Sequence, residues 1–367
     1  EALDLILFTE PARPLHPAFH DLLGPNARIE TPSAPRAVIW EQVALPRALR
    51  RLDVDVFHAP ADGGLPGWKH GRYVLTYHRA LDKSVMHWIA NGELPGGPRD
   101  YGLASGGVLG WSQQARHNFF RRLYLQSADA IIAVSAFCKW ELVELLGVRE
   151  DKVEVIPLAA DEMFTADLPP ARVVATRVKY GLPDRYLIYV GGFDAWKNVD
   201  GLLRAVAEAR RTGVAEALVL AGFGGEVDHL RTLASTLGFV EGRDIFFLGR
   251  IHDDLPALYH GATALVSLSW GESFPFPILE AMSCGTPVVA SKRGGTPELV
   301  RDAGLLVDPR SANETVGAMI SVTNESVRRD LRARGLARAC AYSWRQTAQR
   351  TAAVYERLLS PAPRTAH

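Results

Sequence analysis

The sequence predicts an α/β protein with two successive doubly wound domains. Short runs rich in Val, Ile and Leu, bounded by Gly, Pro or Asp, alternate with amphipathic helical stretches. These runs form two successive sets. The chain of 367 residues is also too long for one ordinary core, which favours two domains of about 150 to 200 residues.

Each predicted strand is an apolar run of the length that parallel strands have in βα units. In the first half the predicted strands are Leu3–Phe8, Val54–His58, Tyr73–Tyr77, Ala130–Val134 and Val153–Ile156. In the second half they are Tyr186–Val190, Ala217–Ala221, Ile245–Leu248, Ala264–Ser267, Pro287–Ala290 and Leu305–Val307.

The composition narrows the function classes. Lys+Arg and Asp+Glu both number 41, so no overall field attracts nucleic acid or an acidic membrane, and an anion site must be built locally. The three cysteines lie far apart without metal-ligand spacing, which predicts a reducing, cytoplasmic compartment and no metal site. No apolar run is long enough to span a bilayer, and residues 1–10 have the character of a buried strand rather than of a signal peptide.

Two irregular regions interrupt the pattern. Pro157–Asp184 contains Pro169-Pro170 and few periodic apolar residues, which predicts the join between the domains. Asn91–Gly110 is rich in glycine, and loops of this length are usually functional or mobile. We expect this loop to contact the acceptor of the reaction inferred below.

Two acidic residues stand out in "GESFPFPILEAMSCGTPVVAS". Pro277 suits the first position of a helix over Ile278–Ser283, so Glu280 lies about one turn inside this helix and Glu272 in the loop before it. A helix N-terminus attracts a phosphate or the polar edge of a sugar, and two flanking carboxylates suit a ligand with many hydroxyls. Spacing alone favours the alternative, an ordinary helix entry with surface acids.

A second candidate site follows the first strand of the second half. The strand ends in Gly191-Gly192, a helix begins near Asn198, and Lys197 stands at its entrance, as in a phosphate site. An ammonium about 4 Å from a phosphate oxygen contributes about 4 kcal/mol at an effective dielectric of 20, against about 0.3–2 kcal/mol from a helix dipole. Lys197 therefore dominates if it points inward; the alternative is a solvated lysine.

Further glycine turns follow other strands of the second half. Four such turns in one half favour a shared ligand crevice at the carboxyl ends of the strands. The remaining three contain Gly222 and Gly224, Gly249-Arg250-Ile251, and Gly294-Gly295.

In the first half, His58 and His78 each end a strand and can face the crevice, although a lone histidine is more often structural. Arg116–Gln126 mixes aromatic and basic residues. It can lie on an anionic membrane or, as is more common, pack between domains with its arginine stems along apolar surface.

Four segments together resemble the retaining glycosyltransferases of family 4, which have the GT-B architecture of two facing Rossmann-like domains. "ADAIIAVSAFCKWELVELLGVREDKVEVIPLAAD" resembles the strand–Ser–helix unit and the entry to the interdomain linker. "YVGGFDAWKN" resembles the diphosphate turn, and "GESFPFPILEAMSCGTPVVASKRGGTPELV" the E-x7-E motif with its Gly-Gly-x-Pro-Glu turn. "YSWRQTAQRTAAVYERLL" resembles the C-terminal helix that crosses back to the first domain.

The resemblance implies a role for each candidate residue. Glu272, His78 and Lys197 are the implied catalytic group: Glu272 lies by the transferred sugar, Lys197 meets the diphosphate, and His78 approaches from the other domain. Glu280 binds the ribose hydroxyls, and the amides of Ser273 and Phe274 hold sugar hydroxyls. The other implied substrate-binding residues are Gly191, Gly192, Gly222 and Gly224, with Gly249, Arg250 and Ile251 bordering the base. The family uses no metal, and its retention is ascribed to same-face attack.

The chain departs from the family pattern at three points. Gly192 stands where many members have an arginine, and Pro275 replaces a common glycine and so removes an amide donor. The family usually opens with a strand and a Gly-rich loop, and this chain is expected to lack both.

The implied organisation is an acceptor-binding domain over 1–160, a linker over 161–184, a nucleotide-sugar domain over 185–340, and a crossing helix and tail over 341–367. The implied reaction transfers a hexose, with mannose and GDP-mannose favoured, to a glycan, lipid-linked or small-molecule acceptor. It implies no cofactor and no nucleic acid, and it leaves open a peripheral contact at the cytoplasmic membrane face. The alternative is a non-catalytic GT-B partner that binds a nucleotide sugar or scaffolds another transferase; a GT-B epimerase or phosphorylase fits less well.

Overall fold

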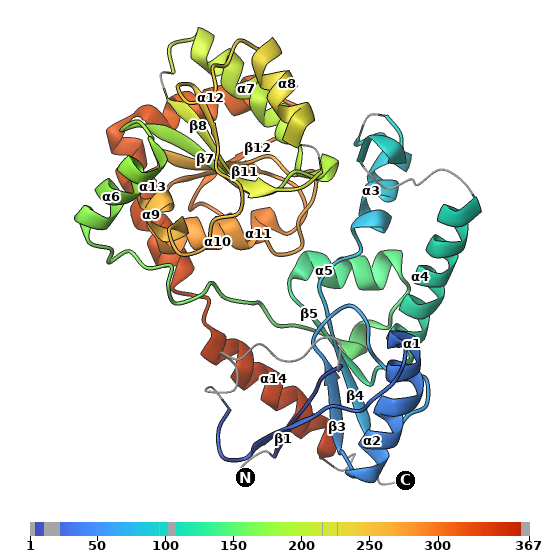
Figure 1. The fold of residues 1–367 in the computed structure, drawn as a ribbon. Coiled ribbons are helices and arrows are strands. Elements are labelled where there is room, and N and C mark those ends of the chain that lie inside the picture. The colour runs from blue at the N-terminus through green and yellow to red at the C-terminus, as the bar shows by residue number, and fades with distance from the viewer. Residues whose placement is uncertain are drawn as a thin grey trace.

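The computed structural model describes residues 4–10, 23–94, 96–101, 108–214, 216–225 and 227–360. Two parallel sheets, each with its own helices, form two lobes, and the last helix returns from the second lobe to the first (Figure 1). The α/β class, the two facing domains and the returning helix are as predicted. No helix within these residues is both long and apolar enough to cross a membrane.

The sheet of the C-terminal lobe has the strand order β12-β11-β10-β7-β8-β9, and all its pairings are parallel. Its strands are β7 (Tyr186–Gly192), β8 (Ala217–Phe223), β9 (Ile245–Phe247), β10 (Ala264–Ser267), β11 (Val288–Ser291) and β12 (Leu305–Val307). The order reverses between β7 and β10, which is the doubly wound Rossmann arrangement.

Alternating side chains of this sheet enter two separate cores. Leu187 and Tyr189 pack with α7 (Val199–Arg211) and α12 (Ala312–Thr323) on one face. Tyr186 and Ile188 pack on the other face with α9 (Leu255–Gly261), α10 (Phe276–Ser283) and α11 (Thr296–Val300). Because both faces are covered, these strands are nearly continuous apolar runs, and the sequence therefore predicted them well.

The sheet of the N-terminal lobe has the order β3-β4-β5-β6, again parallel. Its strands are β3 (Val56–Ala59), β4 (Arg72–Tyr77), β5 (Ala130–Ala133) and β6 (Val153–Val155). β1 (Leu5–Phe8) pairs with β2 (Ala27–Glu30) in a separate two-stranded sheet, and Phe8 packs against Phe57 of β3 with ring centroids 6.2 Å apart. β2 was not predicted, because "ARIE" is not an apolar run.

The remaining elements are helical. In the N-terminal lobe they are α1 (Ala37–Ile39), η2 (Trp40–Ala44), α2 (Leu45–Arg51), α3 (Leu81–Ala90), η3 (Pro98–Tyr101), α4 (Val108–Ser127), α5 (Ala136–Trp140), η4 (Glu141–Leu145) and η5 (Glu150–Lys152). Later in the chain they are α6 (Pro170–Tyr180), η6 (Ala195–Lys197), α8 (Val227–Thr236), α9 (Leu255–Gly261), α10 (Phe276–Ser283), α11 (Thr296–Val300), α13 (Glu325–Ala339) and α14 (Trp344–Leu359).

Helix α14 connects the C-terminal lobe to the N-terminal sheet (Figure 1). Val354 is fully buried against Val74 and Ile132. The Tyr355 hydroxyl lies 2.5 Å from Nδ1 of His58, whose Nε2 contacts the Thr76 hydroxyl. These two contacts make His58 a structural residue of the α14 contact rather than a residue of the crevice. Burial lowers its pKa to about 4.

The predicted join holds one regular element that sequence reasoning missed. Residues 161–184 include α6, which packs against α9 of the C-terminal lobe. Gly181 ends this helix in the left-handed conformation, with φ 62°. The domain boundaries themselves stay predictions.

Candidate active site

The strand-order reversal brings two loops together. The turn after β7 and the loop after β10 both leave the carboxyl edge of the sheet at this point, where open α/β sheets form their ligand crevice. Asn198, which precedes α7, donates from Nδ2 to the Leu268 carbonyl at 3.1 Å. This buried hydrogen bond fixes the first loop against the second.

An ion pair forms at this position. Lys197 Nζ lies 2.6 Å from Oε1 of Glu272, and both side chains are largely buried, with 16% and 14% of their area exposed. The Ser269 hydroxyl donates to the same carboxylate oxygen at 3.0 Å. Lys197 is therefore not a solvated lysine, and two of the three implied catalytic residues are in direct contact.

Positive charge reaches this position from both lobes. The Trp196 ring contacts the Lys197 ammonium, 4.0 Å from its centroid, and the Arg79 guanidinium at 5.1 Å. The Trp196 carbonyl accepts the Trp270 N–H at 2.9 Å. Arg79 follows directly after His78 in the chain, and it is Arg79 that contacts the Trp196 ring.

Glu280 has different surroundings. Helix α10 begins at Phe276, one residue before the predicted start at Pro277. It ends, as predicted, before Gly285, whose φ is 75°. Glu280 accepts a hydrogen bond of 2.9 Å from the hydroxyl of Tyr259, a fully buried residue of α9. Burial raises the pKa of Glu280 to about 7, with a smaller lowering by the Tyr259 bond.

The Gly-Gly turn after β11 supports the Glu272 loop. A Cβ at Gly294 would lie 2.6 Å from the Glu272 carbonyl oxygen and 2.8 Å from its nitrogen, and φ of Gly294 is 64°. Gly295 N–H donates to the same carbonyl at 2.6 Å. Only glycine fits position 294, on grounds of both space and conformation.

The other glycine turns lie at neighbouring strand ends. A Cβ at Gly222 would come within 1.9 Å of the Gly191 carbonyl oxygen, so the β7–β8 edge requires glycine there. Gly192 and Gly224 complete these two turns. After β9, the Arg250 guanidinium lies 4.0 Å from the centroid of the exposed Phe223 ring. Gly249 has φ 70°. Ile251 packs against the core that contains Tyr186 and Ile188.

Sequence reasoning missed Glu141, a buried acid of the N-terminal lobe with 1% of its area exposed. Its carboxylate accepts hydrogen bonds from the Ser84 hydroxyl at 2.5 Å, the Ala80 N–H at 3.1 Å and the Ser273 hydroxyl at 3.3 Å. Burial raises the pKa of Glu141 to about 7. Glu141 therefore connects the loop after Glu272 to the other lobe, and Phe274 adds an apolar contact by packing against the cores of both lobes.

Glu298 makes a second connection. Its carboxylate accepts the N–H groups of Ala136 at 3.0 Å and Phe137 at 3.1 Å, at the start of α5. Ser135 caps that helix by accepting the Cys138 N–H. The sequence did single out the Gly-Gly-x-Pro-Glu turn that contains Glu298 and assigned this turn to the crevice. It did not show which residues Glu298 contacts.

His78 is not in contact with the ion pair. Its N–H donates to the Asp62 carboxylate at 2.5 Å, and its Nε2 lies 3.0 Å from the Pro60 carbonyl.

Of the Gly-rich loop, residues 95 and 102–107 lie outside the described residues. Within the described ones, Tyr101 packs edge-on against Trp270, with centroids 5.7 Å apart, so the loop reaches the second lobe. Across the described part of the chain, no three His, Cys, Asp or Glu side chains gather to hold a metal ion.

Two family models match the chain. The model described as "Glycosyl transferases group 1" matches residues 175–338, and the model described as "Glycosyltransferase Family 4" matches residues 3–163. Together they cover both lobes.

Curated relatives match the chain over different lengths. The O-antigen chain mannosyltransferase B of Escherichia coli is 36% identical over 238 residues, which are 64% of this chain and 62% of that protein. The serotype-specific mannosyltransferase WbdA of Escherichia coli is 28% identical over 67% of this chain and 32% of that protein. The matched part thus spans less than two thirds of these relatives. D-inositol 3-phosphate glycosyltransferase 1 of Catenulispora acidiphila is 28% identical over 95% of this chain and 85% of its own.

Solved structures share the fold. Sucrose-phosphate synthase of Thermosynechococcus elongatus superposes with a TM-score of 0.72 at 21% identity, over 97% of this chain and 89% of that one. HepE of Anabaena, in its complex with UDP-glucose, gives a TM-score of 0.71 at 18% identity, over 96% and 99%. The fold is therefore GT-B.

Proposed function

Because the chain belongs to the glycosyltransferases of family 4, we propose that it transfers a hexose from a nucleotide diphosphate sugar to an acceptor hydroxyl. The observation that carries the proposal is the Lys197–Glu272 pair at the strand-order reversal of the C-terminal sheet. A buried ammonium there suits a diphosphate, and a carboxylate beside it suits the hydroxyls of the adjoining sugar.

The transfer breaks the bond between the anomeric carbon and the diphosphate oxygen and forms a bond from that carbon to the acceptor oxygen. In the retaining route the acceptor attacks from the face that the diphosphate leaves, and its proton passes to a leaving phosphate oxygen. Lys197 and Arg79 then offset the charge that grows on the diphosphate, without a metal. In this proposal Glu280, which accepts a hydrogen bond from the Tyr259 hydroxyl, also accepts hydrogen bonds from the ribose hydroxyls. In the same proposal the amides of Ser273 and Phe274 hold sugar hydroxyls, and His78 approaches the sugar from the other lobe.

We favour mannose as the sugar and GDP-mannose as the donor. The names of the two Escherichia coli relatives support mannose. The acceptor class is a glycan or a lipid-linked saccharide, and the reaction takes place in the cytoplasm.

A peripheral contact with the cytoplasmic membrane face fits helix α4. Phe119 is 65% exposed and Arg122 is exposed beside it, whereas Arg121 is buried and pairs with Asp82 at 2.9 Å. An exposed aromatic ring next to an exposed cation suits an anionic interface. Co-sedimentation with phosphatidylglycerol vesicles, absent with phosphatidylcholine vesicles and weakened in Phe119→Ser/Arg122→Gln, tests this contact.

Calorimetry tests the donor assignment. The panel contains GDP-mannose, UDP-glucose and other nucleotide sugars, and each ligand that binds is then assayed for donor hydrolysis and for transfer. We expect GDP-mannose to bind and to be hydrolysed slowly. Binding without turnover on a broad acceptor panel would support the non-catalytic alternative, and no binding of any nucleotide sugar would refute the proposal.

A further inference from the structure

A pocket lies next to the Glu272 loop, between the lobes. It has a volume of about 450 Å³, and its walls come from the region of α3 and α5 on one side and from the loops after β11 and β12 on the other. Gly294, which packs against the Glu272 backbone, is part of its lining. Whatever binds here is therefore adjacent to the position proposed for the reacting sugar.

The wall from the N-terminal lobe is aromatic. Phe137 stacks on Trp88, with centroids 6.0 Å apart and planes 20° apart, and on Trp140, at 5.5 Å and 24°. Trp88 is buried, whereas Phe137 and Trp140 are half-buried. Aromatic faces carry a negative quadrupole, which suits the C–H face of a sugar ring, and pockets of this kind combine such faces with a few polar groups.

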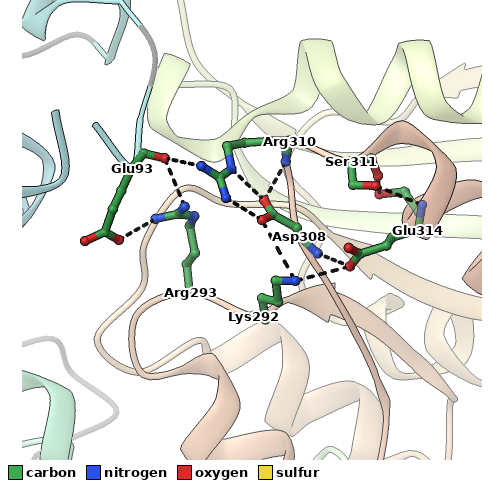
Figure 2. A network of polar contacts seen from close by, with 8 residues as sticks. Glu93, Lys292, Arg293, Asp308, Arg310, Ser311 and Glu314 are labelled. Carbon is green, nitrogen blue, oxygen red and sulfur yellow. Dashed lines mark hydrogen bonds and ion pairs between the residues drawn. The ribbon is translucent and has the colours of Figure 1, made fainter. Parts of the chain in front are cut away.

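The opposite wall is charged. Lys292, Arg293, Arg310 and Asp308 line it, and Glu93 faces them from the N-terminal lobe. Lys292 also contacts the Glu314 carboxylate at 3.4 Å, so each of the three cations has an acidic partner. Figure 2 shows Arg293 and Arg310 converging on Glu93, while Asp308 lies between Arg310 and Lys292.

Arg293 has incomplete hydrogen bonding for a buried cation. Its side chain is only 10% exposed. Its contact with the Glu93 carboxylate is 3.5 Å long, and its Nε has no hydrogen-bond partner in the described part of the chain. A guanidinium binds a carboxylate or a phosphate best through two parallel hydrogen bonds, which Glu93 does not provide here.

We propose that this pocket binds a saccharide unit of the acceptor that carries a negative charge, with its ring against the aromatic wall and its phosphate or carboxylate on Arg293. The inference rests on the proposed transfer reaction and narrows its acceptor. Arg293 donates to the Glu93 carbonyl at 3.1 Å and lies 5.7 Å from the centroid of the Trp88 ring, while its contact with the Glu93 carboxylate is 3.5 Å long. The anionic group of the saccharide replaces this carboxylate.

The test titrates mannose 1-phosphate, glucuronic acid and the neutral methyl α-mannoside into the protein by saturation-transfer NMR. Saturating GDP fills the donor site, and a repeat in Lys197→Ala removes the phosphate site proposed there. We expect a charged sugar to bind at least about tenfold more tightly than the neutral one, as one charge-assisted bond would give. The two charged probes distinguish a phosphate from a carboxylate.

Two variants are expected to act in opposite directions. Arg293→Lys keeps the charge without the planar fork and should weaken binding of the charged sugar. Glu93→Gln removes the competing carboxylate and should strengthen it, since the Glu93 backbone carbonyl still accepts from Arg293 and Arg310. Neither variant should change binding of the neutral sugar, and exposed Arg329→Lys is the control.

Equal weakening by both variants would show that the pocket is only a contact between lobes, and would overturn the proposal. Charged and neutral sugars that bind alike in the parent protein, or that do not bind, would also overturn it. If GDP and all nucleotide sugars fail to bind, the transfer reaction fails instead, and the Lys197→Ala titrations still report on the pocket. Thermal melting verifies the fold of each variant.

Discussion

Glu272 and Glu280 belong to the same short motif, but they lie in different environments. Glu272, in the loop after β10, contacts the Lys197 ammonium at 2.6 Å and the Ser269 hydroxyl at 3.0 Å. Glu280, in α10, accepts from the Tyr259 hydroxyl at 2.9 Å, and burial raises its pKa to about 7. One carboxylate has a cation beside it, and the other has one neutral donor.

The difference indicates two roles. A carboxylate that already pairs with an ammonium is held in position where the diphosphate and the sugar would meet. A buried carboxylate without a cation keeps lone pairs for further donors, such as two ribose hydroxyls. A pKa raised from 4.5 to about 7 corresponds to about 3 kcal/mol of disfavoured ionisation, which ligand hydroxyls can offset.

The largest expected effect follows from removing Lys197, the ion-pair partner of Glu272. Lys197→Ala should lower kcat by at least about 100-fold, because it removes charge stabilisation of the leaving diphosphate. Steady-state kinetics with the donor identified by calorimetry measures this. The matched control is Lys179→Ala, which breaks an exposed ion pair of 2.5 Å with Asp254 and should leave turnover unchanged. Near-normal turnover in a folded Lys197→Ala protein would reject the site.

A substitution of Glu280 should change the affinity for the donor more than the rate of the chemical step. Glu280→Gln is expected to weaken binding of the nucleoside diphosphate by about 10- to 100-fold, the loss of charged hydrogen bonds, with a smaller change in kcat at saturation. Calorimetry measures the affinity, and Glu325→Gln, a change at an exposed acid, is the control. A large fall in kcat with unchanged affinity would contradict the proposed role of Glu280 in binding and would place it in the chemical step instead.

The contrast also shows what the sequence could and could not predict. Strands such as Tyr186–Val190 were predictable because burial on both faces makes them apolar runs, and the glycine turns follow from their position after those strands. Spacing alone could not show that Lys197 meets Glu272, because that contact depends on β7 and β10 being neighbours.

Contacts between the lobes were even harder to predict from the sequence. Glu141 looks like an ordinary helix acid in the sequence, and the turn motif around Glu298 does not show which residues it contacts. Their partners, Ser273 and Ala136, lie more than a hundred residues away in the chain and are brought near only when the lobes pack together. Local periodicity carries no information on such pairs.

The pH dependence sharpens the comparison. Ribose hydroxyls favour the ionised form of Glu280, so binding should lower its pKa, and donor affinity should rise as pH increases through about 7. Between pH 6 and 8 the affinity should rise about tenfold and then level off. Calorimetry with an intact nucleotide sugar avoids titration of a terminal phosphate. The same slope in Glu280→Gln would assign the dependence to another group.

The smallest expected effect concerns the hydrogen bond that ties the Glu272 loop to the N-terminal lobe. The Ser273 hydroxyl lies 3.3 Å from the Glu141 carboxylate, a long hydrogen bond whose partners are both buried. Glu141→Gln and Ser273→Ala should each lower kcat/KM about three- to tenfold, because a misplaced loop moves Glu272 away from its reacting position. If the two residues act through this bond, the double variant should lose less than the product of the single losses, with a coupling of about 0.5–1 kcal/mol. Thermal melting separates this from general destabilisation, and losses that multiply independently would show that Glu141 supports only its own lobe.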